Sequence, residues 1–118
     1  MLQNTAKLLG FKPELRLTGP VHTLVSDDVR EHLLAVLAEA LSNIVRHAGA
    51  SHVAVAVDVS DDIALTVRDD GRGIAAGRPG NGLRNIRERA VLMGGTSEVV
   101  SEAPGGTLIR WRVPRREI

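Results

Sequence analysis

Two consecutive runs of alternating apolar residues constrain the fold of this chain more than any other feature. Valine occupies every second position of residues 53–59, and Ile63, Leu65 and Val67 do the same in the next run. An apolar period of two residues predicts a β-strand with one covered face. The residues between the runs, Ser60-Asp61-Asp62, are typical of a turn. The two strands are therefore predicted to form a hairpin.

The second run continues into Asp69, whose place in the alternation puts its carboxylate on the covered face. An unpaired buried charge is very costly, so Asp69 must find hydrogen-bond donors there. Gly71 and Gly73 follow at once, and glycine lets a ligand come close to the backbone. We therefore expect a ligand pocket at the end of this strand. Asp70 is predicted to be a solvated loop residue or a structural partner.

A long helix is predicted over residues 29–48, ending at Gly49. At 100° per residue one apolar stripe forms, comprising Leu34, Leu37, Leu41, Ile44 and Ala48. Glu39, Asn43 and His47 follow one another at intervals of four residues and lie along one line. That line is either a solvent-exposed face or the wall of a cleft. The helix has no lysine and its polar side includes Val36 and Ala40, which favours the wall of a cleft.

The rest of the chain supplies a half-buried strand over residues 14–18, a possible short helix near residues 20–28, and a Gly/Pro loop over residues 74–82. A second helix is expected from near Gly82 to Gly94-Gly95, followed by strands over residues 97–101 and 107–113. The order β-α-β-β-α-β-β predicts an α+β, two-layer α/β sandwich: a mixed, mostly antiparallel sheet with helices on one face. We interpret residues 1–10 as a linker remnant and residues 11–118 as the domain.

Composition excludes several classes of protein. With 118 residues, the chain fits one domain. Aromatic residues make up 2% and the net charge is +1, both of which argue against nucleic-acid binding. Without cysteine there are no disulfides and no thiol catalysis. There is no signal-peptide pattern and no apolar run long enough to span a membrane, so we expect a cytoplasmic domain without membrane insertion.

The polar residues fit an adenine nucleotide. The Asp69 carboxylate can accept hydrogen bonds from a donor-rich ring, and the N-terminus of the helix near Gly82 is an anion site. The side-chain oxygens of Asn43 and Glu39 are ligands that suit Mg²⁺. Arg46 can meet a phosphate. Each feature alone is weak, but their joint order is more specific.

Four segments in order resemble the motifs of the GHKL ATPase superfamily. Residues 39–48 resemble its N box, residues 69–73 its G1 box, residues 80–83 its G2 box, and residues 105–107 its last glycine motif. The resemblance covers about residues 11–114 and implies the Bergerat-type fold. The chain is most similar to the catalytic, ATP-binding domain of a sensor histidine kinase.

Residues 80–89 and Met93-Gly94-Gly95 are typical of the histidine kinases that pair with NarL-type response regulators. The chain is also similar to the actinobacterial haem-based dormancy sensor kinases. These resemblances imply a full-length homodimer with a dimerisation and phospho-acceptor domain, and a NarL-type regulator downstream.

The resemblance also implies roles for individual residues. Asp69 would accept a hydrogen bond from the exocyclic amine of adenine, and Thr107 would help to hold the ring. Asn43 would ligate Mg²⁺, and Glu39 would be the catalytic residue, orienting water or the metal or assisting proton transfer. The remaining residues would contact phosphates or ribose or shape the lid end of the site: Arg46, His47, Gly71, Gly73, Gly80, Gly82 and Leu83.

Two features depart from the broader pattern. Only six residues, Ile74 to Pro79, separate the G1 and G2 glycines, and this short lid lacks the usual Phe. None of the four histidines is followed by Asp or Glu, as a phospho-acceptor of this subgroup usually is; the following residues are Thr23, Leu33, Ala48 and Val53. We therefore expect the acceptor to be absent from this chain. The alternatives are an anti-sigma-factor-type serine kinase of the same superfamily and a non-enzymatic docking module.

Overall fold

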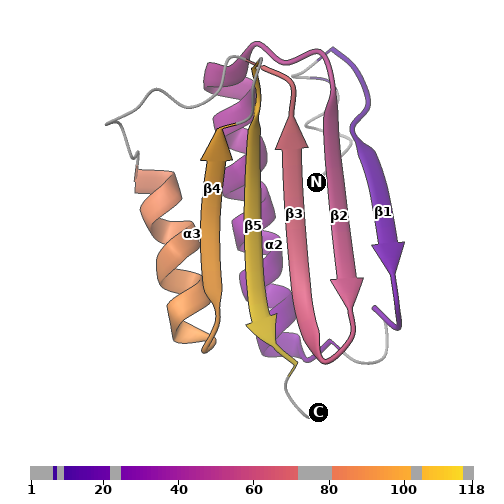
Figure 1. Cartoon of the computed structure of the whole chain (residues 1–118), viewed down its shortest axis with the longest axis vertical. Helices are drawn as coiled ribbons and strands as arrows, with labels where there is room; N and C mark the ends of the chain where they lie inside the picture. The colour runs from indigo at the N-terminus through magenta and orange to yellow at the C-terminus, as the bar shows by residue number, and fades with distance from the viewer. Residues whose placement is uncertain (1–6, 8–9, 22–24, 72–80, 102–104, 116–118) are drawn as a thin grey trace.

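The computed structural model describes residues 7, 10–21, 25–71, 81–101 and 105–115. Its elements follow the predicted order (Figure 1): β1 (Glu14–Thr18), α2 (Asp27–Asn43), which continues as a π-helical turn (Ile44–Ala48), β2 (Val53–Val59), β3 (Asp62–Asp69), α3 (Asn81–Leu92), β4 (Thr96–Ser101) and β5 (Thr107–Pro114). No helix in the described part of the chain has the length and apolar character needed to cross a membrane.

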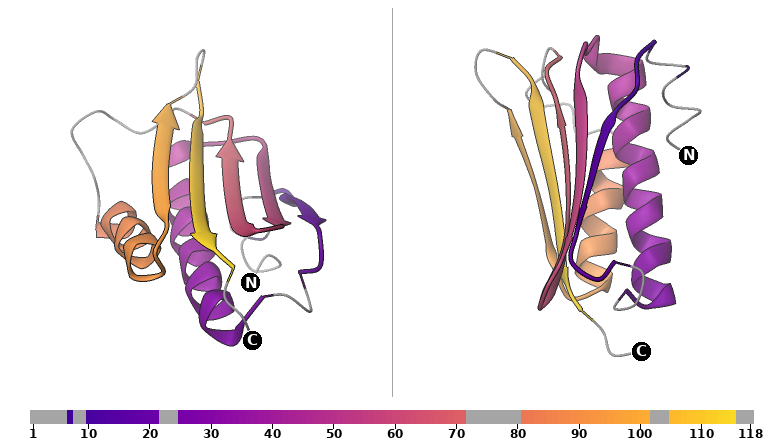
Figure 2. Two further views of the ribbon diagram at one scale, coloured as in Figure 1. Left: turned by 60° about the horizontal axis from the view of Figure 1, so that its bottom comes forward. Right: turned by 90° about the vertical axis from the view of Figure 1, so that its right-hand side faces the viewer.

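The five strands form one sheet in the order β1-β2-β3-β5-β4. β1 pairs with β2 in parallel, and the other three pairings are antiparallel. Both helices lie on the same face of the sheet and leave the other face uncovered, as the right-hand view of Figure 2 shows. The predicted α+β sandwich with a mixed, mostly antiparallel sheet is therefore confirmed.

The core lies between the helices and the covered face of the sheet. The alternating residues of β2 and β3 point into it, as the sequence predicts. Thr107, Ile109, Trp111 and Val113, at alternate positions of β5, are likewise buried. Trp111 is the largest fully buried side chain among those described. Burial of this apolar face is the main term that stabilises the domain.

The long helix begins two residues before its predicted start and ends as predicted, and Leu37, Leu41 and Ile44 of the predicted stripe are buried. Ser26 caps its start by accepting from the backbone N–H of Val29 (3.3 Å), and Gly49 follows its end at a left-handed φ of 60°. Leu34, expected in the core, is 43% exposed, whereas Val36 and Ala40, expected on the polar side, are fully buried. The buried arc is displaced because α2 packs against α3 as well as against the sheet.

β1 differs from its prediction in burial. The sequence predicts a half-buried strand, but all five of its residues are exposed, with Leu15 at 50% and Leu17 at 48%. β1 lies at the edge of the sheet with a single strand neighbour, β2. Of the stretch expected to hold a short helix, residues 20 and 21 are not helical and residues 27 and 28 already belong to α2.

Three of the elements that carry predicted site residues end or begin at one end of the molecule. The C-terminal end of α2, the end of β3 and the start of β5 all lie at the top of Figure 1. This follows from the topology, because β3 and β5 run antiparallel and side by side. The end of one strand therefore meets the start of the other, and residues 69 and 107 become neighbours.

Candidate functional site

Asp69 and Thr107 form a buried polar pair at this end of the sheet. They are 5% and 4% exposed, and among the described residues they are the polar residues buried in an otherwise apolar core. Asp69 lies directly opposite Thr107 in the β3–β5 register. The Asp69 Oδ1 accepts a hydrogen bond from the backbone N–H of Gly71 (2.8 Å). The predicted position of Asp69 on the covered face is therefore confirmed, and Thr107 lies beside it.

The Gly105-Gly106 pair packs tightly against the Asp69 turn. Gly106 has a φ of +124°, and a Cβ atom added to it would lie 2.4 Å from the carbonyl oxygen of Asp69. A Cβ atom on Gly105 would lie 3.2 Å from the carbonyl oxygen of Gly71. In the sequence these glycines stand out only as part of a motif. The structure adds the reason: two backbone segments approach too closely for a side chain at position 106.

Asp70 joins the same turn to the loop that follows α2. Its Oδ1 accepts from the backbone N–H groups of Ser51 and His52 (both 2.8 Å), and its Oδ2 accepts from the Ser51 hydroxyl (2.6 Å). The hydrogen bond from the Ser51 side chain, followed by that from the His52 backbone, lowers the pKa of Asp70 from its ordinary value. Of its two predicted roles, structural partner is confirmed.

Asn43 stands where α2 changes from α-helical to π-helical winding. Such π-helical insertions occur frequently at functional sites. The Arg46 Nη2 lies 3.4 Å from the Asn43 Oδ1, and the Arg46 Nε lies 3.4 Å from the Ser42 carbonyl oxygen. Glu39 is one turn earlier on the helix, and Glu39 and Asn43 are both half-buried. Glu39 and Asn43 of the predicted polar line therefore lie at the border between core and solvent.

The side-chain oxygens of Asn43 and Glu39 have the chemistry of Mg²⁺ ligands. The described residues contain no group of three or more His, Cys, Asp or Glu side chains placed to hold a metal. Mg²⁺ needs no such cage, because it binds through one or two protein oxygens, substrate phosphates and waters. The amide oxygen of Asn43 and the carboxylate of Glu39 are suitable ligands. The Arg46 guanidinium already approaches that amide oxygen.

The phosphate end of the predicted site falls largely outside the described residues. Gly73, Gly80 and the lid of residues 74–79 lie in the stretch 72–80, so their roles stay predictions. Of His47 and Gly82 only the helical backbone is described. Leu83, in the first turn of α3, is half-buried against the core.

Comparison with known proteins places the chain among nucleotide-binding domains. The family described as "Histidine kinase-, DNA gyrase B-, and HSP90-like ATPase" matches residues 28–117. The sensor histidine kinase LiaS of Bacillus subtilis is 38% identical over 96 residues, which cover 78% of this chain and 27% of LiaS. This chain thus corresponds to a minor part of the length of that relative.

Two solved structures share the fold. The ATP binding domain of PrrB from Mycobacterium tuberculosis matches with a TM-score of 0.69 and 26% identity, over 98% of this chain and 89% of that one. The histidine kinase AdeS of Acinetobacter baumannii matches with a TM-score of 0.77 over 98% of this chain and 60% of that one. At 23% identity, the likeness to AdeS supports the fold alone.

Proposed function

Because the chain belongs to the histidine kinase-, DNA gyrase B- and HSP90-like ATPase family, we propose that it is the ATP-binding catalytic domain of a two-component sensor histidine kinase. The domain positions Mg-ATP so that a histidine on a separate dimerisation domain takes the γ-phosphoryl group. The imidazole nitrogen forms the new P–N bond, the bond from the γ-phosphorus to the bridging oxygen breaks, and ADP leaves with that electron pair. Positioning and electrostatics carry most of such a transfer.

The observation that carries this proposal is the buried carboxylate of Asp69 beside Thr107. A carboxylate at this depth needs donors, and Gly71 supplies one of them. The exocyclic amine of adenine supplies another, with Thr107 beside the ring. Guanine presents a carbonyl oxygen at that position, which a carboxylate repels. The pair therefore selects adenine over guanine.

The half-buried side of α2 supplies the other end of the nucleotide site. We propose that the Asn43 side-chain oxygen ligates Mg²⁺ and that Glu39, the proposed catalytic residue, orients a water or the metal or assists proton transfer. Bound Mg²⁺ would offset the charge of the phosphates. Arg46 then turns from Asn43 toward a phosphate, and His47 lies near the phosphates or ribose. Glycines 71, 73, 80 and 82 and Leu83 shape the lid end.

We further propose the setting in which the domain works. Residues 11–118 form a cytoplasmic domain, residues 1–10 belong to a linker, and the full-length protein is a homodimer with its own acceptor domain. The downstream partner is a NarL-type response regulator, as the residues around α3 suggest. The similarity to haem-based dormancy sensor kinases stays a prediction, since LiaS is the relative at 38% identity.

The test is a calorimetric titration of Mg-ATP and Mg-GTP into the wild type and into Asp69→Asn. The asparagine keeps the size of the side chain but replaces one acceptor oxygen with a donor. We expect the affinity for ATP to fall about 100-fold or more, because a mismatched buried hydrogen-bonding site discriminates strongly. Asp58→Asn is the matched control, because Asp58 is an exposed aspartate on the same sheet. Equal ATP affinity in the wild type and Asp69→Asn would refute the adenine site.

A second measurement separates the three candidate functions. The domain is incubated with Mg-ATP and a separately expressed acceptor domain, and the product is analysed for its lability in acid. Phosphohistidine, which acid hydrolyses, supports the kinase. Acid-stable phosphoserine on an added anti-sigma-factor antagonist would instead show the serine kinase. ATP binding without any transfer would point to a docking module.

A further inference from the structure

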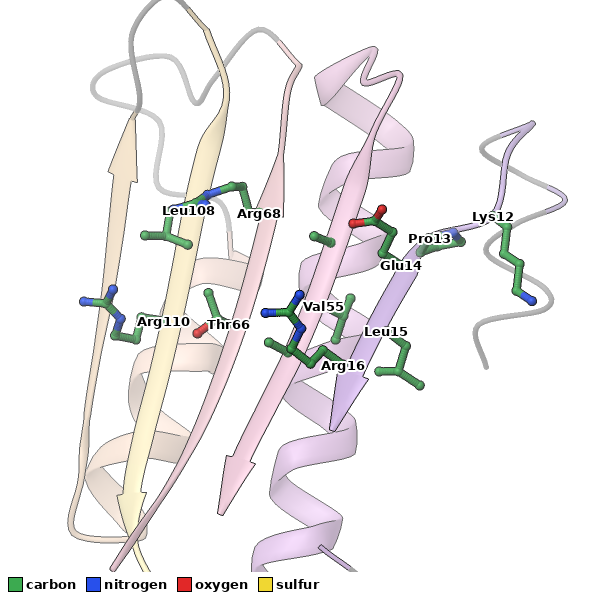
Figure 3. A pocket seen from close by; sticks show the side chains of 12 residues that line it. Lys12, Pro13, Glu14, Leu15, Arg16, Val55, Thr66, Arg68, Leu108 and Arg110 are labelled. Atoms are coloured by element: carbon green, nitrogen blue, oxygen red, sulfur yellow. The ribbon is translucent and has the colours of Figure 1, made fainter. Parts of the chain in front are cut away.

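The uncovered face of the sheet carries a hollow that the nucleotide site does not use. It has a volume of about 1040 Å³. It is lined from the face away from the helices, which lie behind the strands in Figure 3. Its floor is formed by Ala54 and Ala56 of β2 and Thr66 of β3. Arginines from three different strands lie around it, Arg16 from β1, Arg68 from β3 and Arg110 from β5, as Figure 3 shows.

The strand register explains why the hollow exists. Reading across the sheet, Arg16 pairs with Ala56, Ala56 with Thr66, and Thr66 with Arg110. Two long cationic side chains thus flank two short ones. Neighbouring strands are about 4.8 Å apart, so the backbones of the two arginines are separated by roughly 14 Å across the sheet. The small residues leave room at the centre for side chains of another molecule.

Charge on this face is divided between its two halves. The hollow is lined by four cationic residues, Lys12 and the three arginines, against one anionic residue, Glu14. Glu14 lies 3.3 Å from His52, and Arg110 donates to Glu98 at 2.6 Å. The other half of the same face carries Asp58, Asp62 and Arg112, with Arg112 3.8 Å from Asp62. The basic half is therefore bounded by acidic side chains.

We propose that this basic hollow binds an acidic segment of a protein partner. Its composition is that of a protein interface, with arginines around apolar and small side chains such as Leu108 and Ala54. A partner carboxylate can take a bidentate hydrogen bond from a guanidinium group. Nucleic acid fits poorly, because a continuous phosphate backbone would cross the carboxylates of Asp58 and Asp62, and this chain has almost no aromatic residues for stacking.

The hollow also lies behind the nucleotide site. Arg68 immediately precedes Asp69 and Leu108 immediately follows Thr107, and successive residues of a strand point to opposite faces. The acidic segment therefore contacts the same two strand ends that hold the buried Asp69–Thr107 pair, from the opposite side. This docking surface does not depend on the chemistry proposed for that pair.

The test uses a fluorescently labelled peptide of alternating glutamate and alanine, with binding followed by fluorescence anisotropy at low ionic strength. The wild type is compared with the double variant Arg16→Ala/Arg110→Ala. We expect the double variant to bind the peptide about fivefold more weakly, as the loss of two exposed ion pairs predicts. The effect should shrink at high salt, which screens exposed charges.

The matched control is Arg30→Ala/Arg112→Ala, which removes the same charge from the exposed side of α2 and from the acidic half of the sheet face. It should leave peptide affinity within twofold of the wild type, a margin of about 0.4 kcal/mol. Asp69→Asn should bind the peptide normally. An equal loss of peptide affinity in both double variants would overturn the proposal, and so would a wild type that does not bind the peptide. So would a single-stranded oligonucleotide or tripolyphosphate that binds more tightly than the peptide and is lost with the same two arginines.

Discussion

The two faces of the sheet are built from the same strands but differ in the polar and charged side chains that they carry. The covered face is apolar from β2 to β5, except for Asp69 and Thr107 where β3 ends and β5 begins. The open face carries charged side chains that are largely solvent-exposed, such as Glu98 and Arg110. One buried polar pair in an apolar layer has a defined position and defined partners. Each charge on an exposed face contributes little to stability, and such charges act on a partner mainly together.

Trp111 and Arg112 give the sharpest test of this contrast, because they are neighbours that point to opposite faces of β5. Trp111 is fully buried, so Trp111→Ala should lower the free energy of unfolding by about 3–5 kcal/mol. Arg112 contacts Asp62 at 3.8 Å, and both side chains are about half-exposed, so Arg112→Ala should lower the free energy of unfolding by less than about 0.5 kcal/mol. Both values can be measured by denaturation in urea.

A third variant separates lost volume from lost polarity at position 111. The indole Nε1 of Trp111 is buried and has no hydrogen-bond partner among the described residues. Trp111→Phe removes that N–H group while keeping most of the apolar area, so it should cost well under half of what Trp111→Ala costs. A similar cost for Trp111→Ala and Arg112→Ala would mean that the two faces do not differ in the way described.

The Gly106 backbone shows how closely the polar end of the covered face is packed. Gly106→Ala should lower the free energy of unfolding by about 2 kcal/mol or more, because of its positive φ and the contact with the Asp69 carbonyl oxygen. Gly105→Ala meets only the Gly71 oxygen at 3.2 Å and is exposed, so its cost should stay below about 1 kcal/mol. Thermal unfolding of the two variants gives the comparison, and a larger effect at Gly105 would contradict it.

The sequence predicts the covered face well because strand alternation is a local property. Asp69 could be assigned to the core side from Ile63, Leu65 and Val67 alone, and the structure confirms it. Only the resemblance to a family assigned Thr107 and Asp69 to the same adenine ring, since pairing between distant strands leaves no local pattern. The register of β3 and β5 places the two residues opposite each other.

Features that depend on what packs against an element could not be predicted in the same way. The buried arc of α2 was misplaced at Leu34 because the position of α3 is not encoded in α2 itself. Leu15 and Leu17 alternate like half-buried residues, yet β1 lies at an edge. The contact of Ser51 with Asp70 could not be predicted, because the two residues are 19 positions apart and both residue types are common in loops. For Gly73 and Gly80 the prediction stands untested.

Asp70 follows Asp69 directly but is exposed, so it allows a buried and an exposed carboxylate to be compared. The smallest effect on stability is expected at Asp70. Its pKa is lowered, first by the Ser51 hydroxyl and then by the His52 backbone N–H. A carboxyl whose pKa is depressed by folding stabilises the folded state above its ordinary pKa of about 3.9, and that contribution disappears as the pH falls through the folded value. The Asp70 contacts should therefore be lost only in acid, below that ordinary value.

Ser51→Ala removes the largest cause of the lowered Asp70 pKa, the Ser51 hydroxyl, and leaves the two backbone N–H donors in place. We expect the pKa of Asp70 to rise toward its ordinary value in this variant, and acid unfolding to begin at a slightly higher pH than in the wild type. Carboxyl NMR titration measures the first effect and circular dichroism against pH the second, with Ser60→Ala as a control in another loop. An unchanged Asp70 titration in Ser51→Ala would show that the backbone N–H groups alone set its pKa. The Asp70 carboxylate would then be held by the backbone N–H groups of the loop after α2 and not by the Ser51 hydroxyl.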